Sequence, residues 1–147
     1  GEDIDDVMFL FLTLTDKKGN IVSKNEYVIA EVMDKHDWNK YRWWRTQIES
    51  YADFSALDTL APAEVSVAVS EENTITLENK SDVVAFFVRM DLKHNGNVLL
   101  PVLWSDNLVT LQPGETLTIN TNGMNICGID AELVISGWNV SEQKIEL

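Results

Sequence analysis

The feature that most constrains the fold is the pair Asn95-Gly96, which separates two runs of alternating apolar and polar residues. A two-residue β-hairpin loop of type I′ needs positive φ at both central positions, and Asn and Gly adopt positive φ at the least cost. The run before the pair puts four apolar side chains on one face of a strand: Phe86, Val88, Met90 and Leu92. Residues 83–107 are therefore predicted to form a hairpin with one face in a hydrophobic core.

The turn also predicts which residues of the hairpin face each other. A two-residue loop gives the pairs His94 with Asn97, Leu92 with Leu99, Met90 with Pro101, and Val88 with Leu103. The same register brings Phe87 and Trp104 together on the opposite face. An aromatic pair on a face expected to be solvated indicates a second layer, a neighbouring domain or a ligand.

Residues 62–147 consist of short alternating runs separated by turn residues. The segment Gln112-Pro113-Gly114-Glu115 suits a type II turn, because Pro occupies the first central position and Gly the second. The alternating runs number about seven over roughly 85 residues, which is typical of an immunoglobulin-like β-sandwich of antiparallel strands. The sequence therefore predicts an all-β domain and excludes a helical bundle.

Residues 7–30 predict a second hairpin, with the turn segment DKKGN between VMFLFLTLT and IVSKNEYVIA. Both faces of its first strand are apolar, so the strand needs cover on both faces. The hairpin also repeats parts of the central one at a constant spacing: Phe9, Gly19, Asn20, Ile21 and Val22. We therefore assign residues 1–45 to the last strands of a preceding sandwich. Those strands should pack across the complete domain or pair with a second copy of the chain.

Residues 34–62 are the least strand-like part of the chain, and we assign residues 46–61 to a linker. Asp53 or Ser55 can cap a short helical turn that ends before Pro62. Four aromatic residues lie close together before it: Trp38, Tyr41, Trp43 and Trp44. Their rings can stack on sugars or pack at a junction between sandwiches, and the second interpretation is favoured because Trp and Tyr dominate buried contacts.

Charge and motif content narrow the function. The chain has 24 acidic and 11 basic residues, a net charge of −13, which argues against nucleic acid and anionic membrane surfaces as partners. Neither His36 nor His94 has a partner at metal-ligand spacing, so no metal or cofactor is expected. The lone Cys127 forms no internal disulfide. Ser105 lacks the setting of a nucleophile, Asp106 and Asn107 are expected to close a turn, and Glu71-Glu72 is expected to be solvated.

Several motifs together resemble a known family. FFVRMDL, LLPVLWSDN, LQPGE and SGWNV, preceded by YADFSAL, resemble the C-terminal immunoglobulin-like domain of glycoside hydrolase family 2 enzymes of the exo-β-D-glucosaminidase and β-mannosidase group. Residues 7–45 resemble the end of the preceding domain of those enzymes. In that family two glutamates on a (β/α)8 barrel are catalytic, and neither can be carried onto a residue of this sequence. The resemblance implies a non-catalytic module of a retaining glycosidase, in a periplasmic or secreted protein.

Two hypotheses of different class follow. In the first, the domain is structural, and Phe87 and Trp104 contact the remaining domains of the parent enzyme. In the second, it binds carbohydrate: Trp104, Asp106 and either Trp43 or Trp44 hold an oligosaccharide, and the acidic surface helps if the glycan is a cationic glucosamine polymer. The first hypothesis is favoured. The charge argument for the second is weak, because screening at physiological salt limits the reach of the surface charge to about 8 Å. Self-association of the chain through its open apolar strands is a further expectation.

Overall fold

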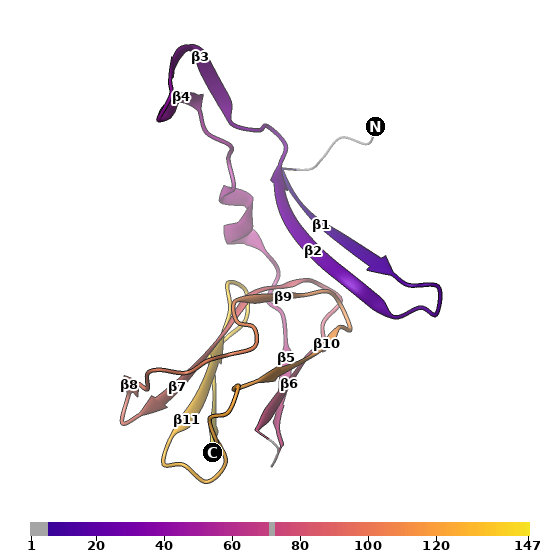
Figure 1. Ribbon diagram of the computed structural model, residues 1–147, viewed down its shortest axis with the longest axis vertical. Coiled ribbons are helices and arrows are strands. Elements are labelled where there is room, and N and C mark those ends of the chain that lie inside the picture. The colour runs from indigo at the N-terminus through magenta and orange to yellow at the C-terminus, as the bar shows by residue number, and fades with distance from the viewer. Residues whose placement is uncertain (1–5, 71–72) are drawn as a thin grey trace. The chain divides into compact units, whose positions relative to one another are not determined.

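The computed structural model describes residues 6–70 and 73–147, so the expectation for Glu71-Glu72 lies outside the described residues. Its contacts divide the chain into two compact units, one ending at Leu60 and the other beginning at Ala61. Both units consist of antiparallel strands, together with one short 3₁₀ helix, Ser55–Thr59, in the first unit (Figure 1). The predicted all-β class is confirmed.

The second unit contains two sheets. The three-stranded sheet has the order β10-β6-β5, with the bounds β5 Val65–Val69, β6 Thr74–Asn79 and β10 Thr116–Asn120. The five-stranded sheet has the order β12-β11-β7-β8, and β9 also pairs with β7. Its bounds are β7 Ala85–His94, β8 Asn97–Val98, β9 Val109–Leu111, β11 Glu132–Ser136 and β12 Gln143–Glu146. This arrangement confirms the predicted immunoglobulin-like sandwich.

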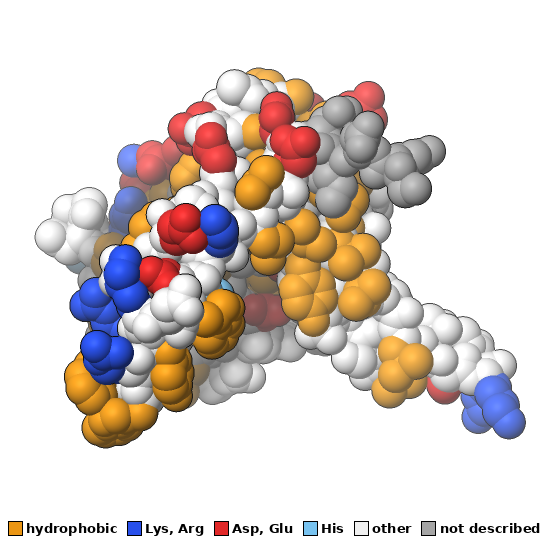
Figure 2. All heavy atoms as spheres, turned by 90° about the horizontal axis from the view of Figure 1, so that it is seen from above, with side chains coloured by type: hydrophobic (Ala, Val, Ile, Leu, Met, Phe, Trp, Pro, Cys, Tyr) orange, Lys and Arg blue, Asp and Glu red, His pale blue; other side chains and the backbone are white. Residues whose placement is uncertain are grey.

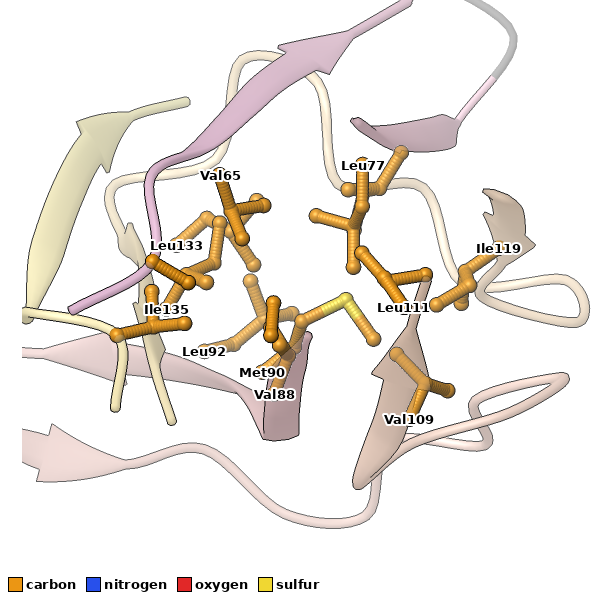
Figure 3. Close-up of a cluster of buried hydrophobic side chains, with 14 of the residues drawn as sticks. Val65, Leu77, Val88, Met90, Leu92, Val109, Leu111, Ile119, Leu133 and Ile135 are labelled. Carbon is orange, nitrogen blue, oxygen red and sulfur yellow. The ribbon is translucent and has the colours of Figure 1, made fainter. Parts of the chain in front are cut away.

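The core of the second unit lies between these sheets. Ile75 and Leu77 of β6 and Met90 of β7 are 0% exposed, as are Leu111 and Leu133. Figure 3 shows side chains from both sheets meeting in one cluster, as the period-two pattern predicts. The alternation is clearest in β7, where the apolar side chains are buried and Phe87 and Arg89 are exposed.

The predicted register of β7 holds only near the turn. His94 pairs with Asn97, and the Leu99 N–H donates to the Leu92 carbonyl at 2.8 Å. The expected partners further along, Pro101 and Leu103, are wrong, because β8 ends at Val98. The Leu100-Pro101 bond that follows is cis. Later residues fill the vacated edge of β7: Val88 pairs with Val109 and Ala85 with Leu111.

A side chain replaces the missing strand partner of Met90. The Met90 N–H donates to Asn107 Oδ1 at 2.9 Å, and Asn107 Nδ2 donates to the Met90 carbonyl at 2.9 Å. The amide of Asn107 thus satisfies both backbone groups, as a neighbouring strand would. Asp106 Oδ1 accepts from the Asn107 N–H and Asn107 Oδ1 from the Leu108 N–H, each at 2.8 Å, so both side chains bond the local backbone as expected, in a bend and not in a closed turn.

Two further asparagines tie loops to the sandwich. Asn79 is 0% exposed and donates to the Val83 carbonyl at 2.7 Å and to the Leu111 carbonyl at 3.1 Å. Asn139, in the SGWNV motif, accepts from the Phe86 N–H at 2.9 Å and donates to the Val84 carbonyl at 2.8 Å. Each amide bonds backbone that lies far from it in sequence, so each holds a loop against a strand.

The predicted turns at residues 95–96 and 112–115 form as expected. Asn95 and Gly96 both have positive φ, 50° and 78°. Gly114 has φ of 73°, and the Glu115 N–H donates to the Gln112 carbonyl at 3.0 Å, as a type II turn requires.

The first unit begins with the predicted hairpin of β1, Val7–Thr15, and β2, Ile21–Ala30. Asp16 organises its turn, because its carboxylate accepts from the Lys18 and Asn20 N–H groups at 2.8 and 2.9 Å. These two strands form a sheet by themselves. Several of their apolar side chains are therefore open to solvent, Leu14 at 60% and Ile21 at 66% among them.

The description of residues 34–62 as the least strand-like part is wrong. β3, Lys35–Arg42, and β4, Arg45–Ser50, form a second two-stranded sheet, so the first residues of the assigned linker 46–61 are strand. Strand alternation was hard to see because β3 carries a large irregularity between Asp37 and Arg42. The predicted helical turn is present as the 3₁₀ helix, and Asp53 Oδ1 accepts from the Ser55 N–H at 2.9 Å.

Candidate functional site

The predicted contact of Phe87 with Trp104 depended on the longer register and fails with it. Phe87 lies at a bulge of β7, has φ of 50° and stacks on Phe86 with 4.0 Å between ring centroids. Its side chain is 46% exposed. Trp104 lies in the loop between β8 and β9 and is half-buried against the core cluster. Asp106, two residues further on, is exposed, with one carboxylate oxygen used by the turn.

The other two predicted site residues, Trp43 and Trp44, form the turn of the β3–β4 hairpin. Their rings meet edge to face, with 5.2 Å between centroids and 83° between planes. Trp43 is 82% exposed and Trp44 is 65% exposed. They belong to the first unit and the other three predicted residues to the second, so the five do not form one site within either unit.

We call residues 35–50 the aromatic hairpin. Two more rings on β3 are exposed, Trp38 at 68% and Tyr41 at 52%. Both lie in the irregular part of β3, where the Asp37 carboxylate accepts from the Asn39 N–H at 3.1 Å and pairs with Lys40 Nζ at 2.9 Å. The Lys40 hydrogen bond holds the pKa of Asp37 below its usual value of 3.8. This local network lies where the register of β3 shifts, between Asp37 and Arg42.

Figure 2 shows hydrophobic side chains gathered in exposed groups on the face that it views, with Lys and Arg side chains beside one group. Large exposed apolar groups on a single chain mark surfaces that contact a partner or a ligand. The most exposed large apolar residues include Trp43 and Tyr51 in the first unit and Leu100 in the second.

The structure contains two hollows that were not predicted from the sequence. One, of about 340 Å³, lies in the first unit and is lined in part by three carboxylates, those of Asp6, Glu31 and Asp53. The Ser55 backbone N–H lowers the pKa of Asp53 below its usual value of 3.8. The other hollow, of about 330 Å³, lies in the second unit and is lined mainly by asparagines from two loops. The residues that line the first hollow are dispersed along the chain, whereas six of the seven that line the second are the consecutive residues 120–125.

Within residues 6–70 and 73–147, no group of three or more His, Cys, Asp or Glu side chains is placed to hold a metal ion. No helix in the same ranges is long and apolar enough to cross a membrane. Cys127 is free, and its thiol lies 3.2 Å from the Ser70 carbonyl oxygen.

The sandwich and the segment just before it match one family. The immunoglobulin-fold domain of exo-β-D-glucosaminidases matches residues 43–140. The chain belongs to this family. The matched range includes the tip of the aromatic hairpin and nearly all of the second unit.

Curated relatives extend the match over almost the whole chain. An exo-β-D-glucosaminidase of Hypocrea jecorina is 38% identical over 96% of this chain, and one of Streptomyces avermitilis is 35% identical over 91%. This chain spans only 17% and 16% of their respective lengths. Most of each relative therefore lies outside the region that this domain matches.

Solved structures agree with the sequence comparison. The crystal structure of the Amycolatopsis orientalis exo-chitosanase CsxA matches 99% of this chain with a TM-score of 0.77 and 29% identity. The matched region is 19% of that chain. A complex of a CsxA variant with PNP-β-D-glucosamine matches equally well, with the same TM-score. The family resemblance stated from the motifs is confirmed.

Proposed function

We propose that this chain is a non-catalytic accessory part of a family 2 retaining glycosidase of the exo-β-D-glucosaminidase and β-mannosidase type, and that it packs against the rest of that enzyme. The observation that carries the proposal is the coverage of the relatives. Nearly all of this chain aligns to glucosaminidases, yet it accounts for only 17% of the Hypocrea jecorina protein. The remaining length offers ample room for a separate catalytic domain.

The exposed apolar surface of the first unit supports packing against other domains. Each of its two sheets has only two strands, and isolated two-stranded sheets are marginally stable in water. Leu12, Leu14 and Val22 of the β1–β2 hairpin are 50–66% exposed together with their neighbour Ile21. Such strands gain stability when another sheet or domain covers them. We place these strands, as part of residues 1–45, in a preceding immunoglobulin-like domain of the parent.

The carboxyl groups with shifted pKa values do not suit acid catalysis. A retaining glycosidase needs two carboxyls about 5 Å apart, one of them with a raised pKa. Hydrogen bonds instead lower the pKa of Asp16, through Asn20, of Asp37, through Lys40, and of Asp53, through Ser55. Each of these three groups donates no proton near neutral pH and serves to order a turn.

The experiment is an activity assay on the purified chain and on the full-length polypeptide that contains it. With p-nitrophenyl β-D-glucosaminide as substrate, the full-length protein should release p-nitrophenol and the 147-residue chain should release none above the buffer rate. A matched full-length protein without this chain should express poorly or unfold at lower temperature. Hydrolysis by the isolated chain would contradict the proposal.

A carbohydrate-binding role is the second candidate, and the exposure of Trp43 and Trp44, 82% and 65%, favours it. Flat aromatic faces open to solvent can stack on pyranose rings. The test is a titration of the chain with chito- and manno-oligosaccharides while tryptophan fluorescence is recorded. Saturable quenching that is lost in Trp43→Ala/Trp44→Ala or in Trp104→Ala would support binding at the respective site. An unchanged spectrum at millimolar sugar would remove this candidate.

A further inference from the structure

The aromatic hairpin carries a charge opposite to that of the rest of the chain. Its 16 residues include four basic and two acidic side chains, whereas the rest of the sequence has seven basic and 22 acidic ones. The hairpin is therefore net positive on a strongly negative chain. The hairpin therefore attracts negatively charged partners, whereas the rest of the chain attracts positively charged ones.

The positive charge is concentrated beside the two tryptophans. Lys35 pairs with Glu49 and Lys40 with Asp37, each at 2.9 Å, so both acidic residues of the hairpin are already neutralised by lysines. Among the described residues no carboxylate pairs with Arg42 or Arg45, and Arg42 donates only to the Tyr41 carbonyl, at 2.9 Å.

Arg42 and Arg45 face each other across the turn of the hairpin. Like charges placed directly opposite on neighbouring strands destabilise the pair. Trp43 and Trp44 occupy the turn between them and are mostly exposed. The two guanidinium groups repel each other, and a partner with carboxylates can offset this repulsion. Trp and Arg are also among the residues that most often anchor protein interfaces.

The charge of the hairpin also favours a protein surface over a glycan as its partner. A glucosamine polymer carries ammonium groups, which Arg42 and Arg45 repel, so the hairpin is poorly suited to a cationic glycan. A protein surface with carboxylates attracts the same groups and can pair bidentately with them. More than four fifths of the length of the curated relatives lies outside the aligned region, which leaves such a surface available within one polypeptide.

We propose that the aromatic hairpin docks on a carboxylate-bearing surface of the parent polypeptide outside these 147 residues. Trp43 and Trp44 are the buried anchors of this contact, and Arg42 and Arg45 form its ion pairs. The proposal rests on the proposed function, since it requires a parent enzyme, and it adds which element makes the contact and what chemistry the facing surface has.

The test is amide hydrogen exchange, measured by mass spectrometry, on the 147-residue chain and on the full-length polypeptide. In the full-length protein the peptides from residues 35–50 should exchange at least about 10-fold more slowly than in the isolated chain, because docking suppresses opening of the hairpin. Arg42→Glu/Arg45→Glu and Trp43→Ala/Trp44→Ala should each restore fast exchange there.

The matched control is Lys17→Glu/Lys18→Glu, which makes the same change of charge in the exposed turn between β1 and β2. It should leave the exchange of residues 35–50 slow. Restoration of fast exchange by this control would show that total charge, and not the hairpin, governs the contact, and it would overturn the proposal.

Other exchange results would show that the hairpin does not dock, or that it binds a second copy of the chain or a glycan. Fast exchange of residues 35–50 in the full-length protein, with slow exchange of β1 and β2, would overturn the docking and leave the proposed packing role intact. Fast exchange of both hairpins would contradict the packing role as well. Protection that appears in the isolated chain as its concentration rises would identify a second copy as the occupant. Protection that appears only with chito-oligosaccharides would identify a glycan.

Discussion

The two units of this chain have the same kind of secondary structure and very different packing. In the second unit, two sheets enclose a core in which Leu77, Met90 and Leu133 are fully buried. In the first unit, each sheet has two strands, and Leu14 and Trp43 are largely exposed. Strand formation alone therefore does not make a domain: the second unit buries its apolar faces against its own chain, whereas the first leaves many of its apolar side chains exposed.

The largest difference in stability is expected between two leucine substitutions, one in each unit. Leu77→Ala removes a side chain that is 0% exposed and should lower the free energy of unfolding by about 2–5 kcal/mol. Leu14→Ala truncates a side chain that is 60% exposed and should change it by less than about 0.5 kcal/mol. Urea denaturation followed by circular dichroism measures both. Equal losses would mean that the first unit has a core of its own in solution.

A smaller loss of stability is expected when the Asn107 amide, which takes the place of a strand beside Met90, is removed. Asn107→Ala leaves the Met90 N–H and carbonyl without their partner and should cost about 1–3 kcal/mol. The control, Asn25→Ala, alters an exposed amide on β2 and should change stability by less than about 0.5 kcal/mol.

Hydrogen exchange at Met90 gives a second measure of the same contact. The Met90 amide should exchange faster in Asn107→Ala than in the unaltered chain, because its acceptor is lost. If exchange at Met90 stays as slow as before, water or a shifted β8–β9 loop has taken over the role of the Asn107 side chain.

The smallest effect concerns pH and the first unit alone. Lys40 lowers the pKa of Asp37 below 3.8, so the folded hairpin binds the Asp37 proton less readily than the unfolded chain does. The stabilisation is therefore complete above pH 3.8 and is lost as the pH falls through the lowered pKa. The effect should be slight because Lys40, the partner of the carboxylate, is exposed, so water and salt screen the ion pair.

An NMR titration of the Asp37 carboxyl should show the lowered midpoint, and amide exchange of β3 should quicken at the acidic end of the titration. In Lys40→Met the midpoint should return towards 3.8, the ordinary value for Asp. A midpoint that does not move in Lys40→Met would mean that the backbone N–H groups of the bulge, and not the lysine, hold the carboxylate charged.

Most strands of the second unit were predictable because their signals are local. Val65 and Val67 alternate with small polar or apolar residues, and Pro113-Gly114 fixes a turn wherever it occurs. The β3–β4 strands were missed because the bulge between Asp37 and Arg42 interrupts the alternation. The candidate site fared less well: Phe87 and Trp104 were expected to meet, and their contact depended on partners that β7 does not have.

Backbone preference and side-chain alternation, which the amino-acid sequence alone carries, determined the sheet class, the turn at Asn95-Gly96 and the inward face of β7. Only the tertiary structure decided what lies beside β7 after the hairpin ends. Several segments could hydrogen-bond the same edge, and the outcome depends on their competition: Val109 pairs with Val88, and Asn107, 17 residues from Met90, satisfies the backbone between. Such competition between distant groups leaves no pattern within any short stretch of sequence.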